Sequence, residues 1–144
     1  MGYHILKTNT IDLPHIHNLN QDALPAVSSI TLNDMTQFLE MADYFRIIRV
    51  KTNIAGFLIA LAPGKNYQSP NYKWFEKKYS QFMYVDRIVI APSFQNKGLG
   101  QSFYDDLKIF CQRYAPIITC EVNLKPKNDE SLLFHKKYGF EQVG

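Results

Sequence analysis

The feature that most constrains the fold is one unit in the second half of the chain: a strand, a loop with two glycines, and a helix. Residues 82–91, FMYVDRIVIA, are rich in β-branched and aromatic residues and predict a strand. After the loop, apolar residues recur at three- and four-residue intervals between Leu99 and Tyr114, which is typical of an amphipathic helix. Residues 116–124, PIITCEVNL, predict the next strand. This order of elements favours a parallel crossover inside a mixed α/β sheet.

The pattern on either side predicts the remaining elements. Strands are expected at 3–6, 44–50, 55–61 and 140–143, and the middle two form a hairpin. One helix is expected at 12–24, with Asp12 as N-cap and Pro14 in its first turn, and a second from Thr31. A third is predicted from Pro70, and a last one ends at Gly139, which suits a helix C-cap.

The composition bounds the class of protein. At 144 residues, with 46% apolar and 20% charged residues, the sequence predicts one globular domain over 1–144. No apolar run approaches the roughly 18 residues of a membrane span, and no secretory signal is evident, so a cytoplasmic protein away from the membrane is expected. The net charge of +3 is small and the lysines are scattered, which argues against nucleic acid as a partner. No metal is expected, because the two cysteines have no zinc spacing and His15 and His17 point apart on a helix.

The loop QNKGLG at 95–100 has the chemistry of an anion site. The first N–H groups of a helix have no intrahelical partners, and the helix dipole adds partial positive charge there. Gly98 and Gly100 let an anion approach the backbone, and Lys97 adds a charge beside it. A plain strand-to-helix turn fits the same residues at least as well, so the loop alone does not decide between the two.

The order of residues excludes two common phosphate loops. A Walker loop carries Gly-Lys-Ser/Thr, whereas here Lys97 precedes Gly98. The dinucleotide loop needs a third glycine three residues after the second, and that position is Phe103. What remains is the pattern Q-x-x-G-x-G between a strand and an amphipathic helix.

This pattern resembles the acetyl-CoA pyrophosphate loop of the GNAT superfamily of N-acetyltransferases. The stretch NDESLLFHKKYGF is similar to that family's downstream motif, whose residues are here Asn128, Ser131, Phe134, Gly139 and Phe140. The spacing of the two motifs and the order of elements fit the family over nearly the whole chain. The resemblance implies an α/β fold with a mixed central sheet, splayed parallel strands and helices on both faces. The family's usual last strand is expected to be missing.

The resemblance also implies where acetyl-CoA would bind. In the family, the strand before the loop separates from its neighbour, and its free backbone groups hold the pantetheine arm. For the arm it implies Ile88, Val89 and Ile90, with Asn128, Phe134 and His135 close by. For the pyrophosphate it implies Gln95, Asn96, Lys97, Gly98, Leu99, Gly100 and Gln101.

His135 is the main departure from the family pattern. The family often places a tyrosine directly after the aromatic residue of the second motif, where it protonates the leaving thiolate. Here that position is His135, which fits either a proton donor in its histidinium form or a cofactor contact alone. Tyr138, one helical turn later, is a weaker substitute.

Glu121 and Asp86 are candidate catalytic bases. Glu121 lies in what the pattern predicts as a central strand, where a charge is costly unless it is paired or used. Side chains alternate along a strand, so Asp86 and Arg87 are expected on opposite faces. Asp86 fits a structural ion pair, for which Arg113 and Arg49 are candidates, as well as it fits a base.

The sequence therefore predicts an N-acetyltransferase that transfers acetyl from acetyl-CoA to a primary amine of a small molecule or peptide. The alternative is an acyl-CoA-binding module or sensor on the same fold, without turnover. The aromatic segment 62–81 is expected either to cover the edge of the sheet or to form a lid over the acceptor site. A homodimer is expected, because the edge left by the missing strand invites pairing.

Overall fold

The computed structural model of the protein describes residues 2–112, 115–122 and 128–144. Within these ranges it holds one five-stranded sheet in the order β1-β2-β3-β4-β5. Neighbouring strands are antiparallel except β4 and β5, which are parallel. The predicted crossover is therefore confirmed. The strands are β1 (His4–Lys7), β2 (Tyr44–Val50), β3 (Asn53–Leu61), β4 (Met83–Ile90) and β5 (Ile118–Cys120).

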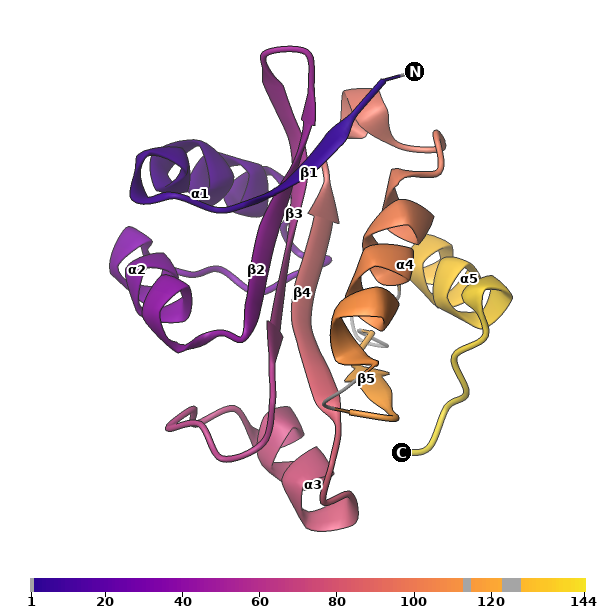
Figure 1. The fold of residues 1–144 in the computed structure, drawn as a ribbon. Helices are drawn as coiled ribbons and strands as arrows, with labels where there is room; N and C mark the ends of the chain where they lie inside the picture. The colour runs from indigo at the N-terminus through magenta and orange to yellow at the C-terminus, as the bar shows by residue number, and fades with distance from the viewer. Residues whose placement is uncertain (1, 113–114, 123–127) are drawn as a thin grey trace.

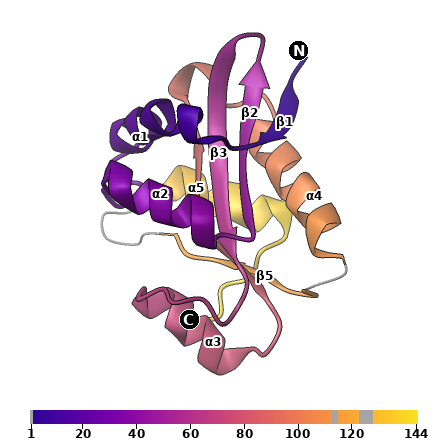
Figure 2. The ribbon, with the colours of Figure 1, turned by 60° about the vertical axis from the view of Figure 1, so that its left-hand side comes forward.

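Helices cover both faces of the sheet (Figures 1 and 2). On one face lie α1 (Leu13–Asp22) and α2 (Leu32–Met41), and on the other lie α4 (Leu99–Cys111) and α5 (Asp129–Tyr138). The helix α3 (Pro70–Lys78) packs at the end of the sheet opposite the chain's N-terminus. This is the mixed α/β architecture that the sequence predicts.

Each face of the sheet has its own apolar core. Beneath α1, α2 and α3, the core includes Ile16, Phe38 and Phe75. Beneath α4, it includes Leu99, Phe103 and Leu107, which are the apolar stripe expected for that helix. The two cores fix α1 and α4 on opposite sides of β4, so the loop before α4 is held at the end of that strand.

Local sequence signals set the helix ends where they are predicted. Thr31 and Asp34 form a capping box at the start of α2, with both N–H to oxygen distances at 3.0 Å. Pro70 occupies the first turn of α3. Gly139 ends α5 with φ 120°, and the N–H of Phe140 donates to the carbonyl of His135 at 3.0 Å. Phe140 is thereby tied to the end of α5.

Two of the predicted strands need correction. No strand forms over 140–144, because Phe140 is engaged at the α5 C-cap and the residues after Gly139 are largely exposed. β5 is only three residues long, and Glu121 lies just beyond its end. Among the described strands β5 is the edge of the sheet, so the expectation of Glu121 in a central strand is wrong. The homodimer stays a prediction.

The prediction that Asp86 and Arg87 face opposite sides is also wrong. Opposite β4, Ile59 pairs with Arg87 and the next residue, Ala60, pairs with Val85, which leaves Asp86 as an extra residue in the ladder. Such a bulge interrupts the alternation of side chains along the strand. Asp86 and Arg87 consequently share one side, and their side chains form an ion pair with Nε to Oδ2 at 2.8 Å.

Candidate functional site

The start of α4 has the geometry of an anion site. Gly98 is its N-cap, with a φ of 79°, in the left-handed region that favours glycine. The N–H of Ser102 makes a helical bond to the Gly98 carbonyl at 3.0 Å. Leu99, Gly100 and Gln101 precede Ser102 in the first turn, where no carbonyl of the helix is placed to accept from their N–H groups. These N–H groups are available to a ligand.

Gly100 has a different task from Gly98. A Cβ on Gly100 would lie 2.9 Å from Cζ of Phe134, which is too close for a carbon contact. The missing side chain lets the ring of Phe134 on α5 pack against the first turn of α4. The two glycines thus serve backbone conformation and helix packing respectively, and both are needed to shape the loop.

β4 and β5 separate partway along β4, before that strand reaches the loop. Their ladder consists of Met83–Ile118, Tyr84–Thr119 and Val85–Cys120, so pairing stops at the bulge. From Ile88 to Ile90, β4 is paired with β3 on its other side. Within the described residues, its edge toward β5 is open there. An extended ligand can add to such an edge as a further strand, through main-chain hydrogen bonds.

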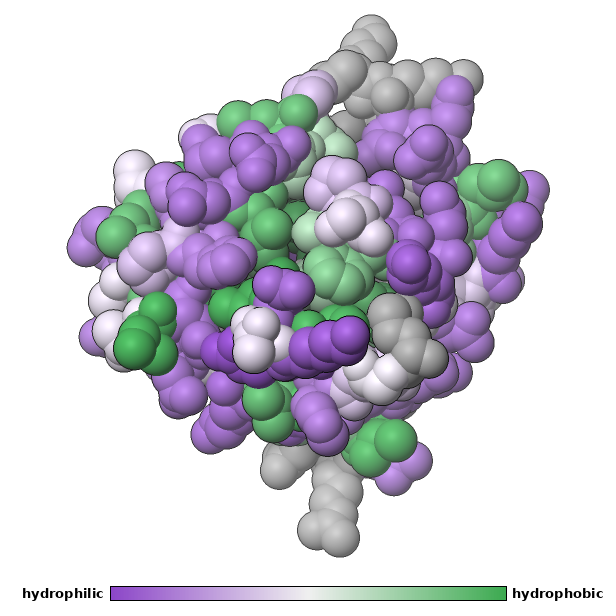
Figure 3. Space-filling model, turned by 90° about the horizontal axis from the view of Figure 1, so that it is seen from above, coloured by the Kyte–Doolittle hydropathy of each residue, from purple (hydrophilic) through white to green (hydrophobic). Residues whose placement is uncertain are grey.

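A cavity of about 550 Å³ fills the space between the separated strands, the loop and α5. Figure 3 shows green apolar residues in a hollow that hydrophilic residues largely surround. The cavity brings together all the residues predicted for the cofactor except Lys97, and both candidate bases. These lining residues are Ile88, Val89, Ile90, Gln95, Asn96, Gly98, Leu99, Gly100, Gln101, Asn128, Phe134, His135, Asp86 and Glu121.

Two of the lining side chains also have structural partners. The Gln95 side chain donates to the Ile90 carbonyl at 3.0 Å, which fastens the loop to the end of β4. Asn128 is the N-cap of α5, and its Oδ1 accepts from the Ser131 N–H at 3.3 Å. Both residues therefore hold the walls of the cavity as well as facing it.

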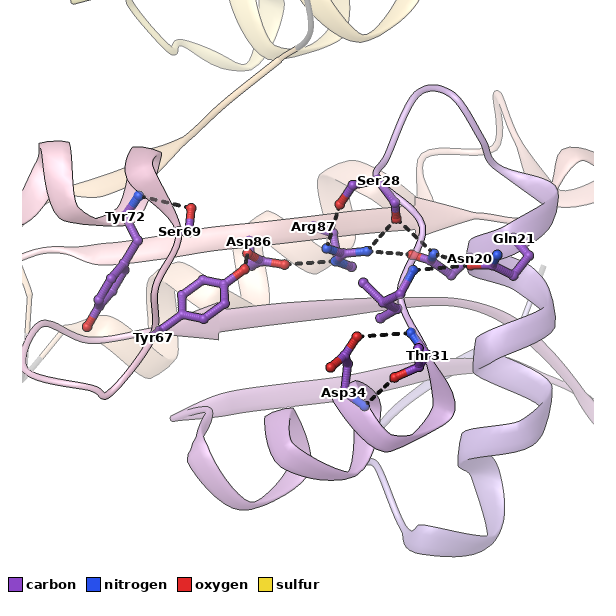
Figure 4. A network of polar contacts seen from close by, with 11 residues as sticks. Asn20, Gln21, Ser28, Thr31, Asp34, Tyr67, Ser69, Tyr72, Asp86 and Arg87 are labelled. Carbon is purple, nitrogen blue, oxygen red and sulfur yellow. Dashed lines mark hydrogen bonds and ion pairs between the residues drawn. The ribbon is translucent and has the colours of Figure 1, made fainter.

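The far end of the cavity is formed by a polar network on β4 (Figure 4). Arg87 donates through Nε to Asp86, through one terminal nitrogen to Asn20 Oδ1 and the Ser28 carbonyl at 2.9 Å each, and through the other to Ser28 Oγ at 3.1 Å. The hydroxyl of Tyr67 donates to the other oxygen of Asp86. The side chains of Arg87 and Asp86 are 5% and 4% exposed. This network fastens the α1–α2 connection and the segment before α3 to the bulge.

Glu121 differs from Asp86 in its surroundings. It is exposed at the point where β4 and β5 part, and one carboxylate oxygen accepts from Asn71 on α3. Partial burial and the negative charge of Asp86 raise the pKa of the Glu121 carboxyl above its ordinary value. The Asn71 hydrogen bond and the charge of Arg87 act in the opposite direction on the same pKa.

His135 lies inside the wall of the cavity, with 6% of its surface exposed. Its Nδ1 is 2.7 Å from the Ser131 carbonyl and its Nε2 is 2.7 Å from the Tyr104 hydroxyl. A carbonyl only accepts, so Nδ1 carries the hydrogen, and in the neutral ring Nε2 accepts from Tyr104. Burial lowers the pKa of His135, with the Ser131 bond opposing it. The histidinium form is therefore disfavoured in the folded protein.

This depressed pKa predicts a loss of stability in acid. In the unfolded chain the imidazole takes up a proton as the pH falls through about 6.5, whereas the folded state resists protonation. We expect His135 to contribute stability above that pH and to lose the contribution below it. The slope is at most about 1.4 kcal/mol per pH unit. Urea unfolding at several pH values should show a shallower acid loss for His135→Gln, and parallel curves would contradict the prediction.

The sequence prediction missed residues that complete the cavity. Tyr104 is fully buried and lines the cavity. Its position four residues after Gly100 places it on the same face of α4, and this spacing could have identified it. Ser28 and its neighbours reach the site through tertiary folding, and no local pattern marks them. Of the aromatic residues in 62–81, Tyr72 and Phe75 are buried in the core, and Tyr67 holds Asp86. None of the three lines the cavity.

Within the described ranges, no group of three or more His, Cys, Asp or Glu side chains is placed to hold a metal ion. No helix among the described residues combines the length and apolarity needed to cross a bilayer. Arg113 lies outside the part of the chain that the structure describes, and so does the ion pair considered for it.

Comparison with known proteins places this site in context. The family model of the acetyltransferase (GNAT) family matches residues 13–140. No curated protein matches the sequence.

Solved structures match over almost the whole chain. Ard1 from Thermoplasma volcanium superposes with a TM-score of 0.80 at 17% identity, covering 100% of this chain and 86% of its own. The aminoglycoside 6'-N-acetyltransferase AAC(6')-Ih from Acinetobacter baumannii gives 0.77 at 16% identity, covering 99% and 93%. The aminoglycoside N-acetyltransferase AAC(6')-Iy, solved in complex with CoA, gives 0.75 at 18% identity, covering 99% and 90%. At these identities the likeness shows a shared fold.

Proposed function

Because the chain belongs to the GNAT family of acetyltransferases, we propose that it transfers an acetyl group from acetyl-CoA to a primary amine by direct attack. The observation that carries the proposal is the open edge of β4 above the bulge, which leads straight to the free N–H groups of α4. One extended molecule with an anionic end fits both features. The acceptor is proposed to be a small molecule or a peptide.

We assign the pyrophosphate of acetyl-CoA to the loop 95–100 and the first turn of α4. Charge-assisted hydrogen bonds from backbone N–H groups and the helix dipole suit a phosphate there. Lys97 does not line the cavity, so its contribution is long-range attraction. The pantetheine arm is assigned to the edge of Ile88–Ile90, with Asn128 and Phe134 on the opposite wall.

The acceptor amine is assigned to the other end of the cavity, between Glu121 and the Asp86–Arg87 pair. Arg87 is committed to its partners, whereas Glu121 is an exposed charge that lines this end of the cavity. A carboxylate suits an amine, which arrives as a cation at neutral pH. Two of the structural neighbours are by name aminoglycoside acetyltransferases, so amino sugars belong among the candidate acceptors.

The test is release of CoA thiol from acetyl-CoA over a panel of amines. The panel includes 1,6-diaminohexane, 6-aminohexanoate, an aminoglycoside and a short peptide with a free N-terminus. We expect thiol release and a matching N-acetylated product with at least one member. Binding of CoA without release from any amine would refute the proposal. It would favour the acyl-CoA-binding module, for which the buried, neutral His135 at the family's acid position is the supporting observation.

A further inference from the structure

The two carboxylates at the acceptor end are not equivalent. Asp86 is enclosed, with its side chain 4% exposed, and its oxygens are held by the Tyr67 hydroxyl and by Arg87 Nε. A base must be in reach of the substrate. Glu121 is exposed to the cavity, and Asn71 is the one described residue with a hydrogen bond to its carboxylate. The structure therefore separates two residues that the sequence left open.

We propose that Glu121 is the general base that accepts the proton of the acceptor amine, that Asn71 orients its carboxylate, and that Asp86 is a positioning residue fixed between Tyr67 and Arg87. The inference rests on the proposed function and adds residue roles to it. It also gives α3 a part in the site, since Asn71 stands in the first turn of that helix.

The step balances as a direct transfer. The amine nitrogen bonds to the carbonyl carbon of the thioester, and the carbon–sulfur bond breaks with its electron pair remaining on sulfur. The nitrogen arrives as an ammonium group and gives one proton to Glu121 before it attacks. The second proton, lost as the amide forms, goes to water, from which the CoA thiolate takes a proton. Glu121 returns its proton to solvent through the mouth of the cavity. Each turnover thus yields one amide and one thiol.

The surroundings of Glu121 give this assignment a measurable signature. Partial burial and the charge of Asp86 raise the pKa of Glu121, and the Asn71 hydrogen bond lowers it. Removing Asn71 should therefore raise that pKa, and removing the charge of Asp86 should lower it. Among the described residues, Tyr84 and Arg87 on β4 and Cys120 on β5 also interact electrostatically with Glu121, and Glu130 and His135 on α5 are further titratable groups that line the same cavity.

The experiment measures kcat/KM against pH with acetyl-CoA and 1,6-diaminohexane. Because the base must be ionised, activity falls on the acid side as Glu121 is protonated. We expect Asn71→Ala to move this acid limb to higher pH and Asp86→Asn to move it to lower pH. Glu121→Gln should lose about 100-fold or more in kcat/KM with CoA affinity unchanged. Glu40→Gln, an exposed carboxylate on α2 outside the cavity, is the matched control and should retain the wild-type rate.

A carbon-13 NMR titration of the Glu121 carboxyl, assigned by its loss in Glu121→Gln, gives the same shifts without any acceptor. Asn71→Ala and Asp86→Asn should shift the acid limb and the titration curve of Glu121 in opposite directions. If they do not, the roles of Asn71 and Asp86 are wrong. Full activity of Glu121→Gln overturns the base assignment alone. Absence of turnover by the wild type with every amine overturns the proposed function and the base with it, while the titration still reports on the two positioning residues.

Discussion

Gly98→Val is expected to lose CoA binding by about 100-fold or more, because the loop can no longer hold its shape with a ligand against it. Valine at a φ of 79° is strained by about 1–2 kcal/mol. Its side chain would also enter the open space above the loop, where a Cβ has no neighbour within 4 Å. Loss of two charge-assisted hydrogen bonds to the pyrophosphate costs about 3 kcal/mol or more. Isothermal titration calorimetry with CoA measures the effect.

Gly64→Val is the matched control for this variant. Gly64 has a φ of 89°, and a Cβ there also meets no atom within 4 Å, but it lies in the segment before α3. Both variants should lose similar stability to backbone strain, and only Gly98→Val should lose CoA. Equal affinity in the two variants would show that the loop is an ordinary turn.

Arg87→Met is expected to destabilise the fold by about 3–5 kcal/mol, because the side chain of Asp86 is left buried without its counter-charge. Methionine preserves most of the length and apolar volume of the arginine stem, so the loss reports on the charge and its hydrogen bonds. Asn20 on α1 and Ser28 in the α1–α2 connection also lose their hydrogen bonds with the guanidinium. Urea unfolding followed by circular dichroism measures the change.

Arg46→Met provides the comparison. Arg46 pairs with Asp106 at 2.8 Å, the same distance as Arg87 with Asp86, but the side chains of Arg46 and Asp106 are 27% and 26% exposed. Water screens such a pair, and about 1 kcal/mol or less is expected from its loss. If the two variants were destabilised equally, the Asp86–Arg87 pair would not be the anchor we describe.

The fold was predictable where local sequence and tertiary structure agree. The β-branched run predicts the strand β4, and the spacing of Leu99, Phe103 and Leu107 predicts the helix α4. The apolar residues that give these two patterns are also the ones buried in the cores on the two faces of the sheet. Strand 140–143 was not predictable in this way. Alternating residues form a strand only when a neighbouring edge pairs with them, and Phe140 is held at the α5 C-cap instead.

The candidate site shows the same division. The loop 95–100 is contiguous in sequence, so its motif identifies nearly all the residues that line that end of the cavity. The end proposed for the acceptor is assembled from α1, α3, β4 and β5. The bulge at Asp86 depends on the pairing register between β4 and β3, and the sequence of β4 alone does not reveal that register. For that reason the sequence left both Asp86 and Glu121 as candidate bases, and the geometry distinguishes their surroundings.

The most direct measurement of the central claim is a crystal structure of the protein with CoA bound. We predict pyrophosphate oxygens on the N–H groups of the loop 95–100 and of the first turn of α4. We also predict main-chain hydrogen bonds from the pantetheine arm to the edge of Ile88–Ile90, and a thiol that ends in the cavity beside Glu121. CoA bound elsewhere, or β5 closed against β4 along Ile88–Ile90 with the cavity filled, would contradict the account.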